Sequence, residues 1–226
     1  MPANHRQSLI QAAFSLKDLL SQTVFTGGSV LPAFVDDPTA PPPRTGNRVE
    51  VIADVPHQAA WMNWQNRLHE LGFEPQSQHT WRKDQVVLSV IPAHLALTSG
   101  KGRWYEEGLF NATSVGLAPN LRVRVLSMPY LLAYLLENIP PRTDLRFSPD
   151  WEDLVYLLAY CPNLPEMVAK AYFEVRETVK KGLASIQAQP LLEENVFYAL
   201  GNNASSSQVR HVKQALVLAG AQRTGR

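Results

Sequence analysis

From residue 127 onward the chain is a succession of helix-forming segments, and this feature limits the possible folds more than any other. Proline lacks a backbone N–H and glycine favours helix ends, so both residues separate helices. Such breaks occur at Pro140-Pro141, Pro162, Pro190 and Gly201-Asn202-Asn203. Between them, helices are predicted over residues 127–138, 149–160, 164–184, 190–200 and 206–219.

The first 126 residues mix helices and strands. Amphipathic helices are predicted over residues 6–20 and 57–71. Strands are predicted at the start of residues 24–34 and over 47–55, 79–82, 85–91, 113–117 and 121–126, with a loop at 36–47 and irregular chain at 92–112. Because the strands precede the run of helices, the predicted class is α+β. We expect a mixed-sheet core over residues 1–126 and a helical region with a basic tail over 127–226.

The strand predicted over residues 47–55 has one apolar face and one largely polar face. Side chains alternate along a strand, so Val49, Val51, Ala53 and Val55 point one way and Arg48, Glu50, Ile52 and Asp54 point the other. Two interpretations fit this pattern. The strand lies at a half-solvated edge of the sheet, or its polar face is the floor of an active site, intact or lost.

Several phrases of the sequence occur in an order typical of one known family. Gly27-Gly28-Ser29 stands between a strand and an apolar segment, and Arg44 and the strand of Glu50 follow. The later phrases are LHELGF (68–73), VVLSVIP (86–92), GRWYEE (102–107), LRVRVLSMPYLLAYLLEN (121–138) and SPDWEDLVYLL (148–158). Over residues 20–180 the chain resembles the nucleotidyltransferase-like family that includes the AbiEii-type abortive-infection toxins. The resemblance implies a bacterial protein related to toxin–antitoxin systems.

The resemblance implies a phosphate-binding corner. In that family the Gly-Gly-Ser turn, here Gly27, Gly28 and Ser29, holds nucleotide phosphates through backbone amides and a hydroxyl, which suit an anion. Arg44, Arg48 and Arg142 would add positive charge to the cleft. A competing interpretation is that Arg48 and Glu50 form a structural ion pair.

The family's chemistry needs two aspartates two residues apart on a strand, with a third carboxylate on a neighbouring strand, to hold divalent metal ions. Here Arg48 and Glu50 occupy the first two places and Ser89 the third. Leu135 stands where the family has a lysine. Asp54 shares the face of Glu50 but lies about 13 Å along the strand, too far to share one ion. We therefore expect no cofactor, and Mg²⁺ only if a rearranged site on Glu50 is active.

Other polar residues have simpler interpretations. Ser148 is a predicted helix N-cap, followed by acidic residues in the first turn. A single cysteine, Cys161, excludes an internal disulfide and is interpreted as a core residue. The histidines show no metal-ligand spacing.

The charge of the chain is unevenly distributed. The net charge is +1, which neither favours nor excludes a nucleic-acid partner. Residues 201–226 carry four basic residues and no acid, whereas the rest of the chain carries 17 basic and 20 acidic residues. The last helix is interpreted either as a docking helix with a frayed tail or as a contact, through Arg210 and Lys213, with nucleic acid or an acidic partner.

Three functions remain open. The leading prediction is a nucleotidyltransferase-fold protein that has lost catalysis and acts by binding a nucleotide, nucleic acid or protein partner. The second is an active metal-dependent nucleotidyltransferase built on Glu50. The third is a structural protein that forms oligomers through its helical half, although the sequence does not fix an oligomeric state. No signal-like or membrane-spanning apolar run is present, so a cytoplasmic protein without membrane association is expected.

Overall fold

The computed structural model describes residues 3–44, 46, 48–94, 105–140, 142–201 and 204–221. The chain forms two compact units. The first contains Met1–Ala33 and Thr45–Ser127, and the second contains Phe34–Arg44 and Met128–Arg226. The sequence led us to expect a division between residues 126 and 127. It did not predict that residues 34–44 belong to the helical unit.

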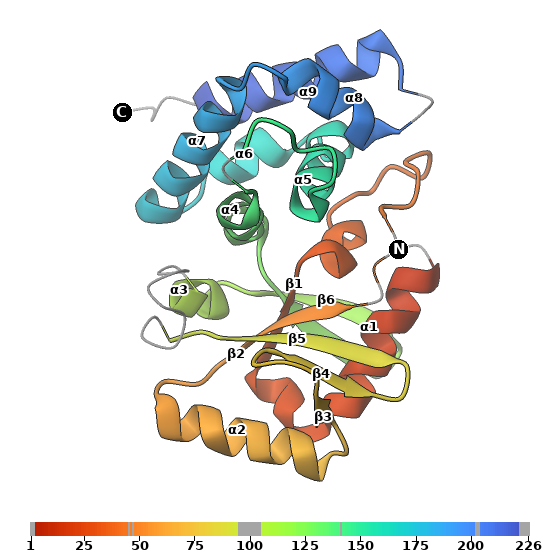
Figure 1. The fold of residues 1–226 in the computed structure, drawn as a ribbon, viewed down its shortest axis with the longest axis vertical. Coiled ribbons are helices and arrows are strands. Elements are labelled where there is room, and N and C mark those ends of the chain that lie inside the picture. Colours follow the sequence, from red (N-terminus) through yellow and green to blue (C-terminus); the bar gives the residue numbers. More distant parts are fainter. Residues whose placement is uncertain are drawn as a thin grey trace. The chain divides into compact units, whose positions relative to one another are not determined.

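A seven-stranded mixed sheet forms the centre of the first unit (Figure 1). Its strands are β1 (Thr23–Thr26), β2 (Val49–Ala53), β3 (Glu74–Pro75), β4 (Thr80–Lys83), β5 (Val86–Pro92), β6 (Thr113–Ala118) and β7 (Leu121–Val125). They lie in the order β3-β4-β5-β2-β1-β7-β6. Strand β2 is antiparallel to β1 and parallel to β5. The chain therefore has the α+β class expected from its sequence.

The edge interpretation of β2 is wrong, because this strand lies in the middle of the sheet between β5 and β1. Its apolar face is buried at Val49, Val51 and Ala53, as the alternation predicts. On the other face Ile52 is also buried, whereas Glu50 is only half-buried. A carboxylate therefore stands on the central strand of the sheet, where an apolar side chain would be usual.

Helical segments accompany this sheet: α1 (Ala3–Leu16), the 3-10 helices η1 (Lys17–Gln22) and η2 (Gly28–Ala33), α2 (Gln58–Glu70) and α3 (Tyr105–Phe110). Helix α1 packs against β2, β5, β6 and η2. The α-helix ends at Leu16 because Lys17 takes a positive φ of 48°, so the expected helix over 6–20 becomes two segments. Helix α3 lies where irregular chain was expected. Of the phrase GRWYEE, residues 102–104 lie outside the described part.

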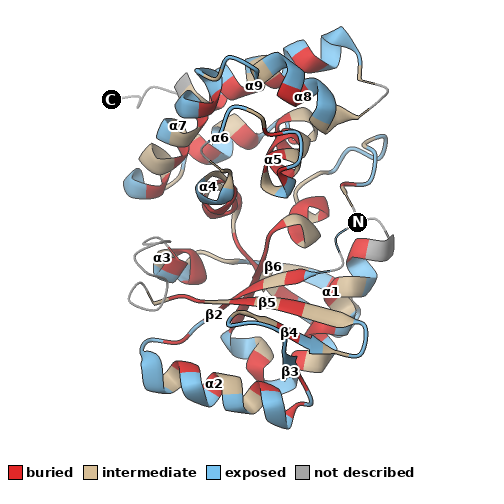
Figure 2. Cartoon of the chain, viewed as in Figure 1, coloured by how far each residue is buried: buried red, intermediate tan, exposed pale blue. Residues whose placement is uncertain are grey.

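The second unit consists of α4 (Met128–Asn138), α5 (Pro149–Tyr160), α6 (Leu164–Ala169), α7 (Phe173–Gln187), α8 (Leu192–Leu200) and α9 (Ser206–Ala221), together with residues 34–44. Buried residues line the strands of the sheet in the first unit and the packed sides of the helices in the second (Figure 2). At the centre of the helical unit, the buried Trp151 indole donates a hydrogen bond to the Asn195 carbonyl at 3.0 Å. The Asn195 side chain in turn bonds the backbone of Thr143 and Leu145.

The prediction of one helix over residues 164–184 is wrong in one respect, because the helix is interrupted between α6 and α7. The buried residues Val168, Val175 and Val179 are seven and four residues apart. Seven residues are two helical turns, so this spacing is the same as in one continuous helix. The interruption therefore cannot be detected from the spacing of the apolar residues.

Within the described residues, no helix is long and apolar enough to cross a membrane.

Candidate functional site

The turn after β1 and the polar face of β2 meet at one point of the first unit. Gly27 follows the last residue of β1 and has a φ of +69°, and η2 starts at Gly28. A Cβ atom built on Gly27 would lie 1.8 Å from Oε2 of Glu50. The Glu50 carboxylate is therefore in direct contact with the glycine, and the structure brings together two of the residues predicted to form the site.

Three strands contribute a row of polar residues beside this turn. In the register of the sheet, Glu50 is opposite Thr26 of β1 on one side and Ser89 of β5 on the other. Residues opposite each other across strands share a face, so the three side chains lie on the face of Glu50. Thr26 is fully buried, and its hydroxyl has no hydrogen-bond partner among the described residues.

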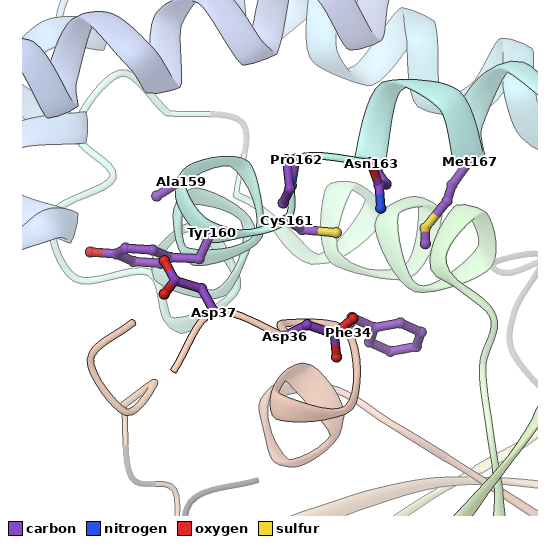
Figure 3. Close-up of a pocket in the computed structure, with 9 residues that line it drawn as sticks. All are labelled: Phe34, Asp36, Asp37, Ala159, Tyr160, Cys161, Pro162, Asn163 and Met167. Atoms are coloured by element: carbon purple, nitrogen blue, oxygen red, sulfur yellow. The ribbon is translucent and has the colours of Figure 1, made fainter. Parts of the chain in front are cut away.

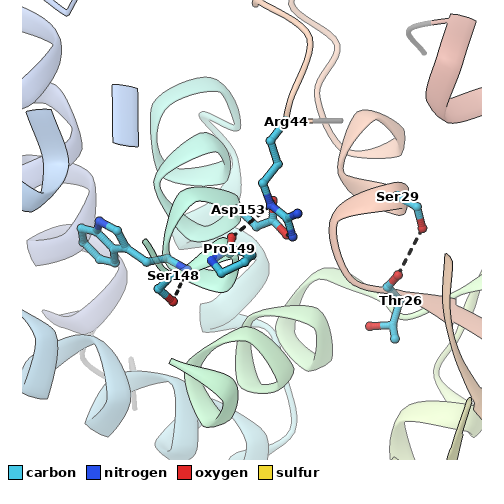
Figure 4. Close-up of polar contacts among 7 residues, drawn as sticks. Thr26, Ser29, Arg44, Ser148, Pro149 and Asp153 are labelled. Atoms are coloured by element: carbon cyan, nitrogen blue, oxygen red, sulfur yellow. Dashed lines mark hydrogen bonds and ion pairs between the residues drawn. The ribbon is translucent and has the colours of Figure 1, made fainter. Parts of the chain in front are cut away.

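Ser29 lies two residues beyond Gly27, in η2. Its hydroxyl donates a long hydrogen bond of 3.4 Å to the backbone carbonyl of Thr26 (Figure 4). A bond of this length is weak, so the hydroxyl can turn toward another acceptor at little cost. The backbone N–H of Val30 donates to the Gly27 carbonyl at 3.2 Å and closes the turn.

The row does not have the composition of a two-metal centre. Glu50 is flanked by hydroxyl groups, where a metal site would need further carboxylates. Among the residues that the structure describes, no group of three or more His, Cys, Asp or Glu side chains is placed to hold a metal ion. Leu135, the residue that the resemblance sets in place of a lysine, is a fully buried core residue of α4.

The predicted arginines do not gather at this point. Arg48, just before β2, is exposed. Among the ion pairs found between the described residues, none joins Arg48 to Glu50. Arg44 and Arg142 belong to the second unit.

Arg44 is bound within the second unit by Asp153, which the sequence analysis counted only among the acidic residues in the first turn of α5. Its Nε and one terminal nitrogen donate to the two carboxylate oxygens of Asp153, both at 2.9 Å (Figure 4). Asp153 is only 1% exposed, and Nε also approaches the Pro149 carbonyl at 3.3 Å. One signal was available in the sequence: Asp153 lies four residues before the buried Leu157, so it falls on the apolar stripe of α5.

The neighbouring Ser148 is the predicted N-cap of α5. Its hydroxyl oxygen accepts a hydrogen bond from the backbone N–H of Trp151 at 3.3 Å (Figure 4). The cap satisfies one of the free amides at the start of the helix. Ser148 therefore has a structural role that needs no further chemistry.

The basic residues of the last helix are partly neutralised. In α9, Nζ of Lys213 forms an ion pair with Glu193 of α8 at 2.8 Å. Arg210 is exposed, and Arg223 and Arg226 lie outside the described residues. The apolar stripe of α9 is buried at Val209, Val212, Leu216 and Ala219, as the docking interpretation expects.

No family model matches the chain, and no curated protein matches it. The function is therefore inferred from the residues and their geometry.

Proposed function

We propose that the first unit is a nucleotidyltransferase-like domain that binds a nucleotide through its phosphates and has lost metal-dependent transfer. One observation carries this proposal: the sheet register sets Thr26, Glu50 and Ser89 in a row beside the Gly27 turn. We interpret this row as the counterpart of the catalytic floor in the family that the sequence resembles. It contains one carboxylate where the family's chemistry needs three.

The loss of transfer follows from the charges in the row. Divalent cations such as Mg²⁺ prefer several carboxylate and carbonyl oxygens, and a single glutamate gives little affinity. The hydroxyls of Thr26 and Ser89 carry no charge to balance a second metal ion. We therefore derive no chemical step through a metal here.

Binding is supported by two groups, an exposed arginine two residues before Glu50 and the Ser29 hydroxyl in η2. Arg48 is exposed and forms no ion pair with Glu50 in the described structure, and a guanidinium can bond two phosphate oxygens at once. The Ser29 hydroxyl is held only by a long hydrogen bond. The carboxylate of Glu50 lies against Gly27 and would repel a phosphate bound at the turn. Affinity for phosphate is therefore expected to be modest.

Thermal unfolding of the full chain with each of the four nucleoside triphosphates tests this function, with magnesium, manganese or EDTA present. A ligand that binds only the native state stabilises it by about 2.7 kcal/mol at a concentration 100 times its Kd. We expect the midpoint to rise by several degrees with at least one nucleotide, and to the same extent in EDTA.

Two variants at the site and one control variant identify it. Arg48→Gln should abolish the shift, whereas Arg82→Gln, which removes an exposed arginine from β4, should leave it unchanged. Glu50→Gln should keep or enlarge the shift, because it removes a negative charge next to the turn. A metal-dependent shift that Glu50→Gln abolishes would instead favour the active enzyme. The absence of any nucleotide shift would reject the proposal and direct the search to nucleic-acid and protein partners.

A further inference from the structure

The second unit contains a pocket that is independent of the site described above. It has a volume of about 460 Å³ and lies between residues 34–37 and the segment that joins α5 to α6 (Figure 3). It is lined by Phe34, Asp36, Asp37, Ala159, Tyr160, Cys161, Pro162, Asn163 and Met167. The volume is within the range of small-molecule sites in proteins, about 300–1,000 Å³.

The lining combines negative charge with polarizable apolar surface. Asp36 and Asp37 contribute carboxylates, and the described residues that line the pocket include no basic side chain. Phe34, Tyr160 and Met167 contribute two aromatic rings and a thioether. Aromatic faces and carboxylates both attract cations, the first through the ring quadrupole and the second through charge.

The carboxylate of Asp37 is held in place and remains ionised. Its Oδ1 accepts hydrogen bonds from the Thr39 hydroxyl at 2.7 Å and from the Thr39 backbone N–H at 2.8 Å. These bonds lower the pKa of Asp37. Burial raises the pKa of Tyr160, and the negative charge of Asp37 adds to the effect, so the phenol experiences the field of the carboxylate.

The wall that carries both aspartates is anchored at its far end. Arg44 closes the segment of residues 34–44 with its paired hydrogen bonds to the buried Asp153 of α5. Helix α5 also supplies Ala159 and Tyr160 on the opposite side of the pocket. The two walls are thus tied to the same helix, which favours a preformed site over one assembled on binding.

We propose that this pocket binds a small organic cation, an ammonium or guanidinium group on a short aliphatic chain. The charged head would bond the carboxylates of Asp36 and Asp37, and the aliphatic chain would lie against Phe34, Tyr160 and Met167. A bare metal ion fits less well. The described residues contain no group of three His, Cys, Asp or Glu side chains placed to bind one, and the Phe34 ring and the Met167 thioether supply no ligand oxygens.

A cysteine in the wall of the pocket can report whether a ligand is bound. Cys161 is the single cysteine of the chain, and its sulfur points into the pocket (Figure 3). It is a free thiol, 5% exposed, and burial raises its pKa. Because the thiolate is the reactive form, alkylation will be slow at neutral pH and is best followed near pH 8.5. A ligand in the pocket would cover the sulfur and slow the reaction further.

The test follows alkylation of the full chain by iodoacetamide, read by mass, with and without millimolar agmatine, and measures agmatine binding by calorimetry. Agmatine carries a guanidinium and an ammonium group on a four-carbon chain. We expect it to slow alkylation at least fivefold and to give a saturable heat. The analogue 4-guanidinobutyrate, which has a carboxylate in place of the ammonium, should protect far less.

Paired variants distinguish the pocket from general charge effects. The double variant Asp36→Asn/Asp37→Asn should lose both protection and heat, while the asparagine oxygen at position 37 can still accept from Thr39. The control Glu106→Gln/Glu107→Gln removes two adjacent carboxylates from α3 of the other unit and should retain both signals. Absence of heat and protection in the natural chain would overturn the proposal, as would protection that persists in the aspartate double variant. Neither result depends on nucleotide binding by the first unit.

Discussion

At the scale of single residues, the contact between Gly27 and Glu50 shows why one position accepts only glycine. The φ of +69° disfavours any residue with a Cβ, by about 1–2 kcal/mol. A Cβ would also displace the Glu50 carboxylate, which stands 1.8 Å from its position. Gly72 has a similar φ of +85°, but the nearest atom to its Cβ would be Cε of Lys83 at 3.7 Å. A substitution at Gly72 would therefore introduce backbone strain alone, whereas one at Gly27 would introduce both backbone strain and steric overlap.

We predict that Gly27→Ala destabilises the chain by about 2–4 kcal/mol, because strain and overlap add. Gly72→Ala should cost only the strain, about 1–2 kcal/mol. Glu50→Ala in the Gly27→Ala background should recover about 1 kcal/mol, since it removes the displaced group. Urea unfolding of the three variants and the natural chain measures these differences. Equal losses for the two glycine variants would show that the carboxylate moves away without cost.

At the scale of elements, the sequence predicted the helix ends and turns that are determined by nearby residues. Helix α5 has the predicted bounds because Ser148 caps it and Pro162 follows it. The hairpin of β4 and β5 turns close to the predicted place, at Asp84, whose φ is +51°. The central place of β2 was not predictable, because it depends on pairing with β1 and β5, which are distant in sequence. The same holds for Arg44 and Asp153, which are separated by 109 residues.

The Arg44–Asp153 pair fixes residues 34–44 to α5, and its loss should be costly. Breaking a buried ion pair by removing one partner typically costs about 3–5 kcal/mol. The Arg44 side chain is 32% exposed, so water can partly solvate the guanidinium left behind. We predict that Asp153→Asn destabilises the second unit by about 2–3 kcal/mol. Urea unfolding measures this loss.

Asp144 provides the matched control, because it forms a similar paired contact with Arg146 on the surface. The Arg146 guanidinium lowers the pKa of Asp144 to about 2, so the carboxylate is ionised at neutral pH, like a typical aspartate. Water screens this exposed pair, and Asp144→Asn should therefore reduce stability far less than Asp153→Asn. Similar losses for the two variants would mean that the buried pair contributes no more than a surface pair.

At the scale of the whole molecule, the two units differ in how much of their organisation the sequence reveals. The change from strands to helices near residue 127 is visible in the sequence, and the units divide between Ser127 and Met128. The candidate site of the first unit was partly predictable, because Gly27 and Glu50 belong to recognisable local patterns. The pocket of the second unit was not, since residues 34–37 read as loop and only the fold brings them to Tyr160 and Cys161.

Each unit has its own buried core, so local damage should remain within the unit that carries it. We predict that Gly27→Ala raises amide hydrogen exchange in β1, β2 and β5 and leaves α5, α7 and α9 close to their natural rates. Asp153→Asn should have the reverse effect, with faster exchange in the helices and little change in the sheet. Exchange measured by mass spectrometry on peptides from both units distinguishes the two patterns. If either variant accelerated exchange throughout the chain, the two cores would unfold together, and the stabilities of the two proposed binding sites would be linked.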